Sequence, residues 1–148
     1  KYCFSDNFPE LQGGTRELSK VFFEKVPVKE ITDNKEIPFA KIVDYLVALK
    51  NENSQEATDQ FMFVYFEQIA NALVYEFYFE EEFKKAGFEV AKLVAQLPDL
   101  EEKSTKFTIL QLREIYIEAH KKDCALRNAV ESVTTIPQIN LINSSVTI

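Results

Sequence analysis

Apolar side chains recur at intervals of three and four residues over most of the chain, and this is the spacing of helices that bury one face. One repeat spans residues 39–50, a second spans 57–80, and a third runs from 83 to 97, where Pro98 ends it. Only three Gly and five Pro interrupt the 148 residues, which favours long regular elements over a turn-rich sandwich or barrel. The sequence therefore predicts a mainly α fold, a bundle of about four helices.

The N-terminal end of the chain breaks this pattern. Residues 1–35 indicate a short mixed segment, with a turn at Gly13-Gly14 and a helix of about two to three turns from Arg16 to Lys25. Pro27 ends that helix and keeps the residue before it extended. We interpret residues 1–35 as a unit separate from the helical domain at 36–131.

The C-terminal end differs again. The last long helix is expected to start near Lys103–Phe107 and to continue to about Val130. Residues 132–148 carry no charge and are rich in Val, Ile, Thr, Asn and Ser. We expect this tail to be extended, either as an edge strand or as a poorly ordered end.

The net charge of −7 is unevenly distributed along the chain. Residues 1–35 balance six basic against six acidic residues, whereas 36–82 carry two basic and ten acidic ones. Bulk attraction to DNA depends on neutralising phosphates with Lys and Arg, so this composition excludes it. The N-terminal third, with Arg16, Lys20, Lys25 and Lys29, is the least unfavourable place for a nucleic acid.

No set of residues has the spacing of a catalytic or metal site. His120 is the only histidine, with no second ligand one turn away, so we expect a surface histidine beside Lys121 and Lys122. Cys124 is expected to be a core-facing thiol. Gly-rich phosphate loops, GxSxG elbows and CxxC pairs do not occur. We therefore predict no catalytic residue, no metal site and no cofactor within this chain.

Two acidic groups could be taken for a cation site and for a nuclease site, but neither has the arrangement that such a site needs. Glu76, Glu80, Glu81 and Glu82 continue one helix instead of converging from a loop, so we expect a solvated face and no cation site. The stretch from Pro98 to Lys103 resembles part of a nuclease signature, but such sites need the second acid and the lysine on a separate strand. We interpret it as the loop before a helix.

The chain begins with Lys1 and has Met62 as its only methionine, so we expect a processed or excised piece. Its start has no apolar signal-peptide region, and no window of about 18 residues is free of charge and dominantly apolar. Cys3 and Cys124 are too few for a secreted disulfide framework. A cytoplasmic location without membrane contact is expected.

Three stretches, taken in order, resemble a known layout. They are Gly13–Val28 (GGTRELSKVFFEKVPV), Phe39–Lys50 (FAKIVDYLVALK) and Ile69–Glu82 (IANALVYEFYFEEE). Together they are similar to the end of the TaqI-like specificity domain of adenine-specific restriction–modification methyltransferases, including fused type II and type IIS enzymes. The likeness covers roughly residues 12–86. It departs from the family at Val28, which replaces a second apolar-Pro pair, and at Asn71, where an acid is common.

This resemblance implies a parent protein that binds duplex DNA, takes S-adenosylmethionine and methylates adenine, with or without a fused nuclease. The Asn/Asp-Pro-Pro-Tyr/Phe catalytic motif is absent from this chain, which implies a non-catalytic C-terminal part. Its helices would brace the recognition module against the remaining domains of the same chain. Arg16, Lys20 and Lys25 would contact backbone phosphates and position the domain without reading sequence.

Two alternatives stay open. Each of the three cations is at least as well explained as a solvated charge on a helix. The chain as a whole is also consistent with a stand-alone acidic helical interaction module, whose surplus of aromatic residues would line a groove for a partner helix.

Overall fold

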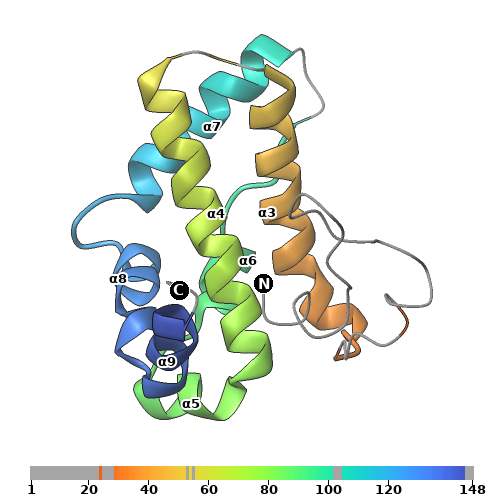
Figure 1. The fold of residues 1–148 in the computed structure, drawn as a ribbon. Helices are drawn as coiled ribbons and strands as arrows, with labels where there is room; N and C mark the ends of the chain where they lie inside the picture. The colour runs from red at the N-terminus through yellow and green to blue at the C-terminus, as the bar shows by residue number, and fades with distance from the viewer. Residues whose placement is uncertain (1–23, 25–28, 53, 55, 102–104, 146–148) are drawn as a thin grey trace, which may run out of the picture.

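The computed structural model describes residues 24, 29–52, 54, 56–101 and 105–145, and these are mainly α-helical (Figure 1). No strand occurs among them, which agrees with the predicted fold class. The helices are α3 (Asp33–Glu52), α4 (Ala57–Tyr78), α5 (Glu80–Ala86), α6 (Val90–Ala95), α7 (Thr105–Ala119), α8 (Ala125–Ser132) and α9 (Pro137–Ser145), with a 3₁₀ turn, η1 (Val133–Thr135), before the last. Within these ranges, no helix combines the length and the apolarity that crossing a bilayer requires.

The two longest helices, α3 and α4, lie side by side and run in opposite directions (Figure 1). The predicted repeat of α4 faces inward as expected. In α3 the predicted stripe is only partly buried, because Val43 and Val47 are exposed while Tyr45 and Leu49 join Ile42 in the core. Helices α6 and α7 pack against this pair, and α8 and η1 extend the packing toward α9. The largest fully buried side chains come from several of these elements: Tyr45, Phe66, Phe83, Ile42, Met62, Ile69, Leu73, Leu112, Ile139, Val90 and Val94.

The helix α3 begins before the predicted repeat does. Pro38, which we expected at the helix start, is instead inside α3, five residues after Asp33. Pro38 is the sixth residue of α3, beyond the four N-terminal N–H groups that have no partner within a helix. The helix continues through this buried proline, although the carbonyl four residues before it receives no N–H from this position.

The segment predicted as one helix from 83 to 97 is divided into α5 and α6. Gly87 ends α5 with a φ of +75°, a left-handed conformation that glycine adopts at little cost. The N–H of Phe88 then donates to the carbonyl oxygen of Phe83 at 3.0 Å. Glycine therefore ends one helix and redirects the chain into the next.

The long final helix is also divided, so its predicted continuation to Val130 is wrong. Helix α7 ends at Ala119, and α8 begins at Ala125. Tertiary partners satisfy the carbonyls freed by this break: the Tyr65 hydroxyl donates to the Ala119 oxygen at 2.7 Å, and Arg127 Nη1 donates to the His120 oxygen at 2.8 Å.

The prediction of an extended tail over residues 132–148 is wrong for residues 133–145, which form η1 and α9. Val133, Ile136 and Ile139 are spaced by three residues, and all are at most 5% exposed. Pro137 is the first residue of α9, where its fixed φ favours a helix. Burial of these three side chains outweighs the strand preference of β-branched residues.

Candidate functional site

The three predicted phosphate contacts, Arg16, Lys20 and Lys25, lie outside the described residues. The Gly13-Gly14 turn and the short helix from Arg16 to Lys25 lie outside them as well. Their assignment therefore stays a prediction. The described chain resumes at Lys29, four residues after Lys25.

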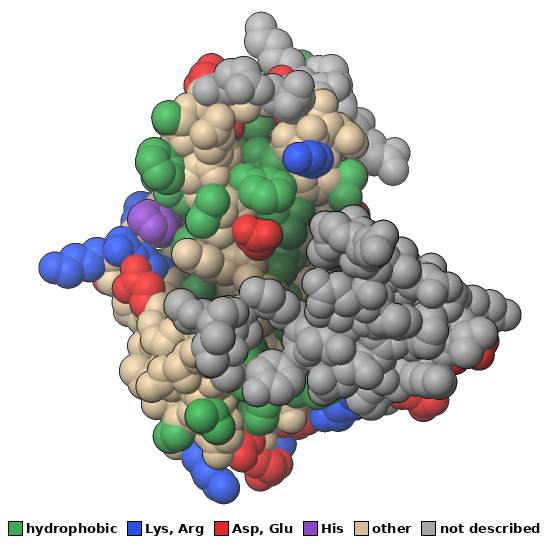
Figure 2. Space-filling view, viewed as in Figure 1, with side chains coloured by type: hydrophobic (Ala, Val, Ile, Leu, Met, Phe, Trp, Pro, Cys, Tyr) green, Lys and Arg blue, Asp and Glu red, His purple; other side chains and the backbone are tan. Residues whose placement is uncertain are grey.

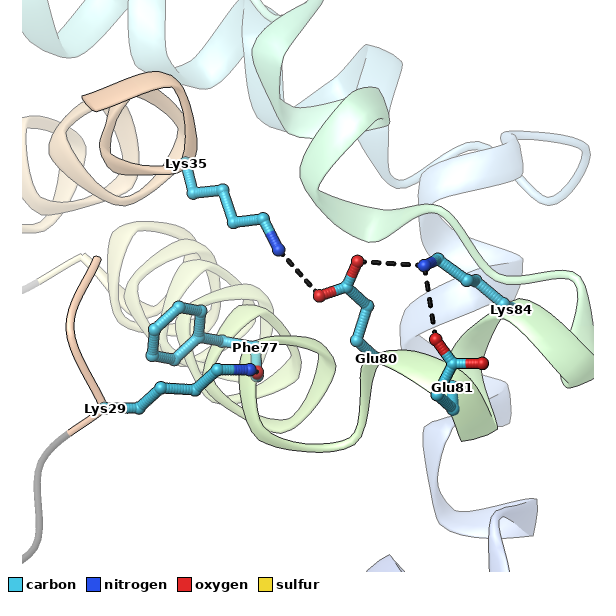
Figure 3. A network of polar contacts seen from close by, with 6 residues as sticks. All are labelled: Lys29, Lys35, Phe77, Glu80, Glu81 and Lys84. Atoms are coloured by element: carbon cyan, nitrogen blue, oxygen red, sulfur yellow. Dashed lines mark hydrogen bonds and ion pairs between the residues drawn. The ribbon is translucent and has the colours of Figure 1, made fainter. Parts of the chain in front are cut away.

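Lys29 is fastened to the C-terminal end of α4 (Figure 3). Its Nζ donates to the carbonyl oxygen of Phe77 at 2.7 Å, and its backbone N–H donates to the Tyr78 hydroxyl at 3.4 Å. The same ammonium lies 4.7 Å from the centroid of the Phe77 ring. The last carbonyls of a helix lack intrahelical partners and carry the negative end of its dipole, so a cation is favoured here.

A chain of ion pairs lies beside this anchor and connects α3 with α5 (Figure 3). Lys35 Nζ lies 2.6 Å from Glu80 Oε2, and Lys84 Nζ lies 3.0 Å from Glu80 Oε1 and 3.4 Å from Glu81 Oε1. Hydrogen bonds from Lys35 and then Lys84 lower the pKa of Glu80 to about 2. The same pairing raises the pKa of Lys84.

A hollow of about 220 Å³ lies among α3, α4, α5 and α6, next to these ion pairs. Apolar walls come from Phe39 on α3, Leu73 and Phe77 on α4, and Phe88 in the turn after α5. The rings of Phe39 and Phe77 meet edge to face, with centroids 6.1 Å apart. Figure 2 shows charged side chains along the lower edge of the molecule, over α5, and apolar ones higher up over α3 and α4.

Glu76 lines this hollow and is half-buried, so its assignment to a solvated face is wrong. Its Oε2 accepts the backbone N–H of Ala91 at 2.6 Å. This N–H belongs to the first turn of α6, whose own N-cap residue, Glu89, makes no side-chain cap. Burial raises the pKa of Glu76, and the charges of Glu89 and Glu80 act in the same direction, while the Ala91 hydrogen bond opposes them.

The remaining acids of that group lie near the surface. Glu81 is exposed and shares Lys84 with Glu80, and Glu82 is half-buried. Glu76 departs from the expected solvated face by a part-buried contact between α4 and α6, and Glu80 forms an ion pair between α5 and α3. Within the described ranges, no three His, Cys, Asp or Glu side chains are grouped closely enough to hold a metal ion.

Lys41 is a buried cation that the sequence pattern did not identify. It is 9% exposed, and its Nζ donates to the carbonyl oxygens of Ala95 at 3.1 Å and Leu97 at 2.5 Å and pairs with Asp99 Oδ1 at 3.0 Å. Ala95 is the last residue of α6 and Leu97 lies two residues beyond it, so the ammonium caps the C-terminal end of that helix. The Tyr45 hydroxyl donates to the Pro98 oxygen beside it. The spacing of Lys41 and Tyr45 was the sequence signal for this contact, because residues four apart share one face of a helix.

Asp59 and Arg113 form a second polar contact that sequence reasoning missed. Arg113 Nε and Nη2 donate to the two carboxylate oxygens of Asp59, both at 2.8 Å, and Nη2 also reaches Glu56 Oε2 at 2.8 Å. The hydrogen bonds from Arg113 lower the pKa of Asp59, whose side chain is only 4% exposed. The pair is 54 residues apart in sequence, so no local pattern could have identified it.

His120 is less exposed to solvent than predicted. It is half-buried, stacked on Tyr116 at 5.1 Å between ring centroids and edge to face with Tyr65 at 5.0 Å. Lys121 and Lys122 beside it are exposed, as expected. Cys124 is half-buried and packs against the hydrophobic core, which agrees with the predicted core-facing thiol.

Comparisons with protein-family models, with curated proteins and with solved structures find no match. The resemblance to a specificity domain therefore remains a hypothesis that rests on its three stretches. The contacts in Figure 3 bring residues near the ends of these stretches together: Lys29 directly follows the first, Lys35 lies four residues before the second, and Phe77 and Glu80 lie in the last six residues of the third.

Proposed function

We propose that this chain is the non-catalytic C-terminal specificity region of a restriction–modification DNA adenine methyltransferase and that its helical bundle braces a DNA-recognition segment. The observation that carries the proposal is the anchoring of Lys29 on the end of α4, directly after the stretch that holds Arg16, Lys20 and Lys25. S-adenosylmethionine and the methyl transfer belong, in this proposal, to other domains of the parent enzyme.

The anchor gives bracing a physical basis. Only three residues separate Lys25 from Lys29, so fixing Lys29 limits how far the preceding cations can move relative to α4. Phosphate contacts fix the register and orientation of a protein on a duplex without reading its bases. A braced set of cations loses less conformational freedom on binding than an unbraced one does.

The charge distribution supports a DNA-facing side at the N-terminal segment. Residues 36–82, which contain most of α3 and all of α4, carry two basic and ten acidic residues. The outer faces of these two helices would therefore repel phosphates. A duplex is therefore expected to approach from the side of residues 16–25 and to avoid the acidic faces of these helices.

The test replaces Arg16, Lys20 and Lys25 with Ala in the full-length protein and measures the Kd for a duplex across a salt series. Each lost phosphate contact should reduce the slope of log K against log salt by about 0.9. A matched control replaces Lys50, Lys121 and Lys122, which are exposed in the structure, with Ala. If both triple variants weaken binding equally, only net charge matters, and the proposed contacts are wrong.

A protein-interaction module remains the second candidate because α7 has an apolar outer face. Phe107, Leu110 and Ile117 follow helical spacing and are 61%, 47% and 60% exposed. Exposed apolar faces of this kind are typical of helices that bind a partner. This candidate predicts that the Arg16, Lys20 and Lys25 variant binds DNA no differently from the unmodified protein.

A further inference from the structure

The hollow among α3, α4, α5 and α6 has the size and walls of a small-ligand site. Its volume is about 220 Å³, and Phe39, Leu73, Phe77 and Phe88 provide apolar surface on several sides. An apolar cavity of about 150 Å³ holds benzene. This hollow therefore has room for one six-membered ring with a short substituent.

The charges around the hollow favour a cation over an anion. Each lysine that lines it already has a carboxylate partner: Lys35 and Lys84 pair with Glu80 at 2.6 and 3.0 Å, and Lys92 pairs with Glu89 at 3.0 Å. Glu76 forms no salt bridge with any described residue, and its recorded hydrogen bond is to the neutral N–H of Ala91. An incoming anion would compete with carboxylates, whereas a cation would meet one that forms no salt bridge within the described ranges, although the charge of Lys35 acts on it.

The aromatic walls favour the same kind of ligand. The face of a phenyl ring attracts cations through its quadrupole. Phe77 already takes the Lys29 ammonium at 4.7 Å from its ring centroid. Phe39 on α3 and Phe88 in the α5–α6 turn add two further rings to the lining.

We propose that this hollow binds a small organic cation, a primary amine carried on a single ring, with its ammonium at Glu76 and its ring among Phe39, Phe77 and Phe88. A carboxylate on one side and apolar rings on the other recognise the two ends of such a molecule. The inference uses none of the residues assigned to DNA and stands independently of the proposed function.

The environment of Glu76 is consistent with this ligand. Burial raises the pKa of Glu76, the Ala91 hydrogen bond opposes this, and the charges of Glu89 and Glu80 raise the pKa further while that of Lys35 lowers it, with a net rise. A bound ammonium would offset this rise and would favour the carboxylate form. Binding should therefore weaken as the pH falls and Glu76 takes up a proton.

The test compares three probes of the same shape by NMR titration of the full chain: 2-phenylethylamine, the neutral 2-phenylethanol and the anionic 3-phenylpropionate. A single-ring ligand is expected to bind with a Kd of about 1 mM. The amine should bind about tenfold more tightly than the alcohol, the usual effect of one charge-assisted hydrogen bond. The anion should bind no more tightly than the alcohol.

Two variants locate the site. Glu76→Gln keeps an oxygen that can accept the Ala91 N–H but removes the charge, so the amine should lose its tenfold preference. Phe88→Leu keeps an apolar wall but removes a ring, and should weaken the amine and the alcohol alike, because both place the same phenyl ring there. Glu67→Gln, on the exposed surface of α4, is the matched control and should change neither affinity.

The proposal is overturned if the amine binds no more tightly than the alcohol, or if none of the probes binds. It is also overturned if Glu76→Gln and Glu67→Gln affect the amine equally, because the attraction then comes from net negative charge and not from this hollow. Chemical shift changes confined to Lys35, Phe39, Leu73 and Phe88 in the unmodified protein provide a readout that does not depend on any variant folding.

Discussion

The Nζ atom of Lys29 lies 2.7 Å from the carbonyl oxygen of Phe77 and 4.7 Å from the centroid of the ring of the same residue. One ammonium thus contacts both a carbonyl at the C-terminal end of α4 and the ring of a buried residue of the same helix. Because Lys29 directly follows the segment assigned to DNA contact, this pair is where that segment would be held against the bundle.

Replacing Lys29 with Met tests the anchor itself. Methionine keeps an apolar stem of similar length but cannot donate to the Phe77 oxygen or place a charge over its ring. Amide hydrogen exchange should become faster over residues 29–35 and stay unchanged in the core of α4, because only a local contact is lost. Lys85→Met, at an exposed position on α5, is the control and should leave both regions unchanged.

Arg113→Met should lower the midpoint of thermal unfolding by about 5 °C, because it leaves the buried Asp59 carboxylate without its bidentate partner. Arg113→Lys should recover only part of this loss, since an ammonium cannot reproduce two parallel hydrogen bonds. Lys92→Met, which breaks the exposed pair with Glu89 at 3.0 Å, serves as the control. Equal shifts for Arg113→Met and Lys92→Met would contradict this account of the Asp59 contact.

Glu76→Gln should change how stability depends on pH. The pKa of Glu76 is raised in the folded chain, so the folded state holds its proton at a pH where the unfolded state has lost it. The stability linked to this proton is greatest below about pH 4 and falls as the pH rises through the raised pKa. Glutamine does not titrate, so the melting temperature of the variant relative to the unmodified chain should increase from pH 4 to 7.

Thermal unfolding measured from pH 4 to 7 checks this prediction. Glu67→Gln is the exposed control, and the difference between its melting temperature and that of the unmodified chain should stay constant with pH. If the melting temperature of Glu76→Gln relative to the unmodified chain instead falls as the pH rises, the folded state favours the charged carboxylate. The Ala91 hydrogen bond would then outweigh burial at this position.

Gly87→Ala should destabilise the chain by about 1 kcal/mol through backbone conformation alone. The added Cβ would meet no atom within 4 Å, but the φ of +75° is costly for an L side chain. Gly87→Asn should cost less, because Asn tolerates the left-handed region better. Denaturant unfolding of both variants checks this order, and an equal loss for both would point to a steric cause instead.

The elements that could be predicted from the sequence were the helices with a regular spacing of apolar residues. The repeats from Phe39 and from Ala57 identified α3 and α4, because a stripe of apolar residues on one face specifies a helix wherever a core is available. The C-terminal tail was misjudged because its β-branched residues indicate a strand, whereas Val133, Ile136 and Ile139 gain more by burial in a helical arrangement.

The contacts of the candidate site were less accessible to sequence reasoning. Lys29 reaches a carbonyl 48 residues away, and Lys41 binds the carbonyls of Ala95 and Leu97, 54 and 56 positions later. Contacts at such separations depend on how the helices pack and not on any short pattern. Glu76 was assigned to a solvated face because Glu80, Glu81 and Glu82 follow it on the same predicted helix. In the structure α6 packs against α4 at this residue, and the Ala91 N–H donates to the Glu76 carboxylate.

The central claim, that the bundle braces a DNA-recognition segment, is tested most directly by the DNA affinity of Lys29→Met in the full-length protein over a salt series. Bracing predicts a severalfold weaker Kd at every salt concentration with an unchanged salt slope, because an ordering contact is lost and no phosphate contact is. An affinity equal to that of the unmodified protein would contradict bracing. A slope reduced by about 0.9 would contradict it too, since Lys29 would then contact a phosphate itself instead of holding the segment to α4.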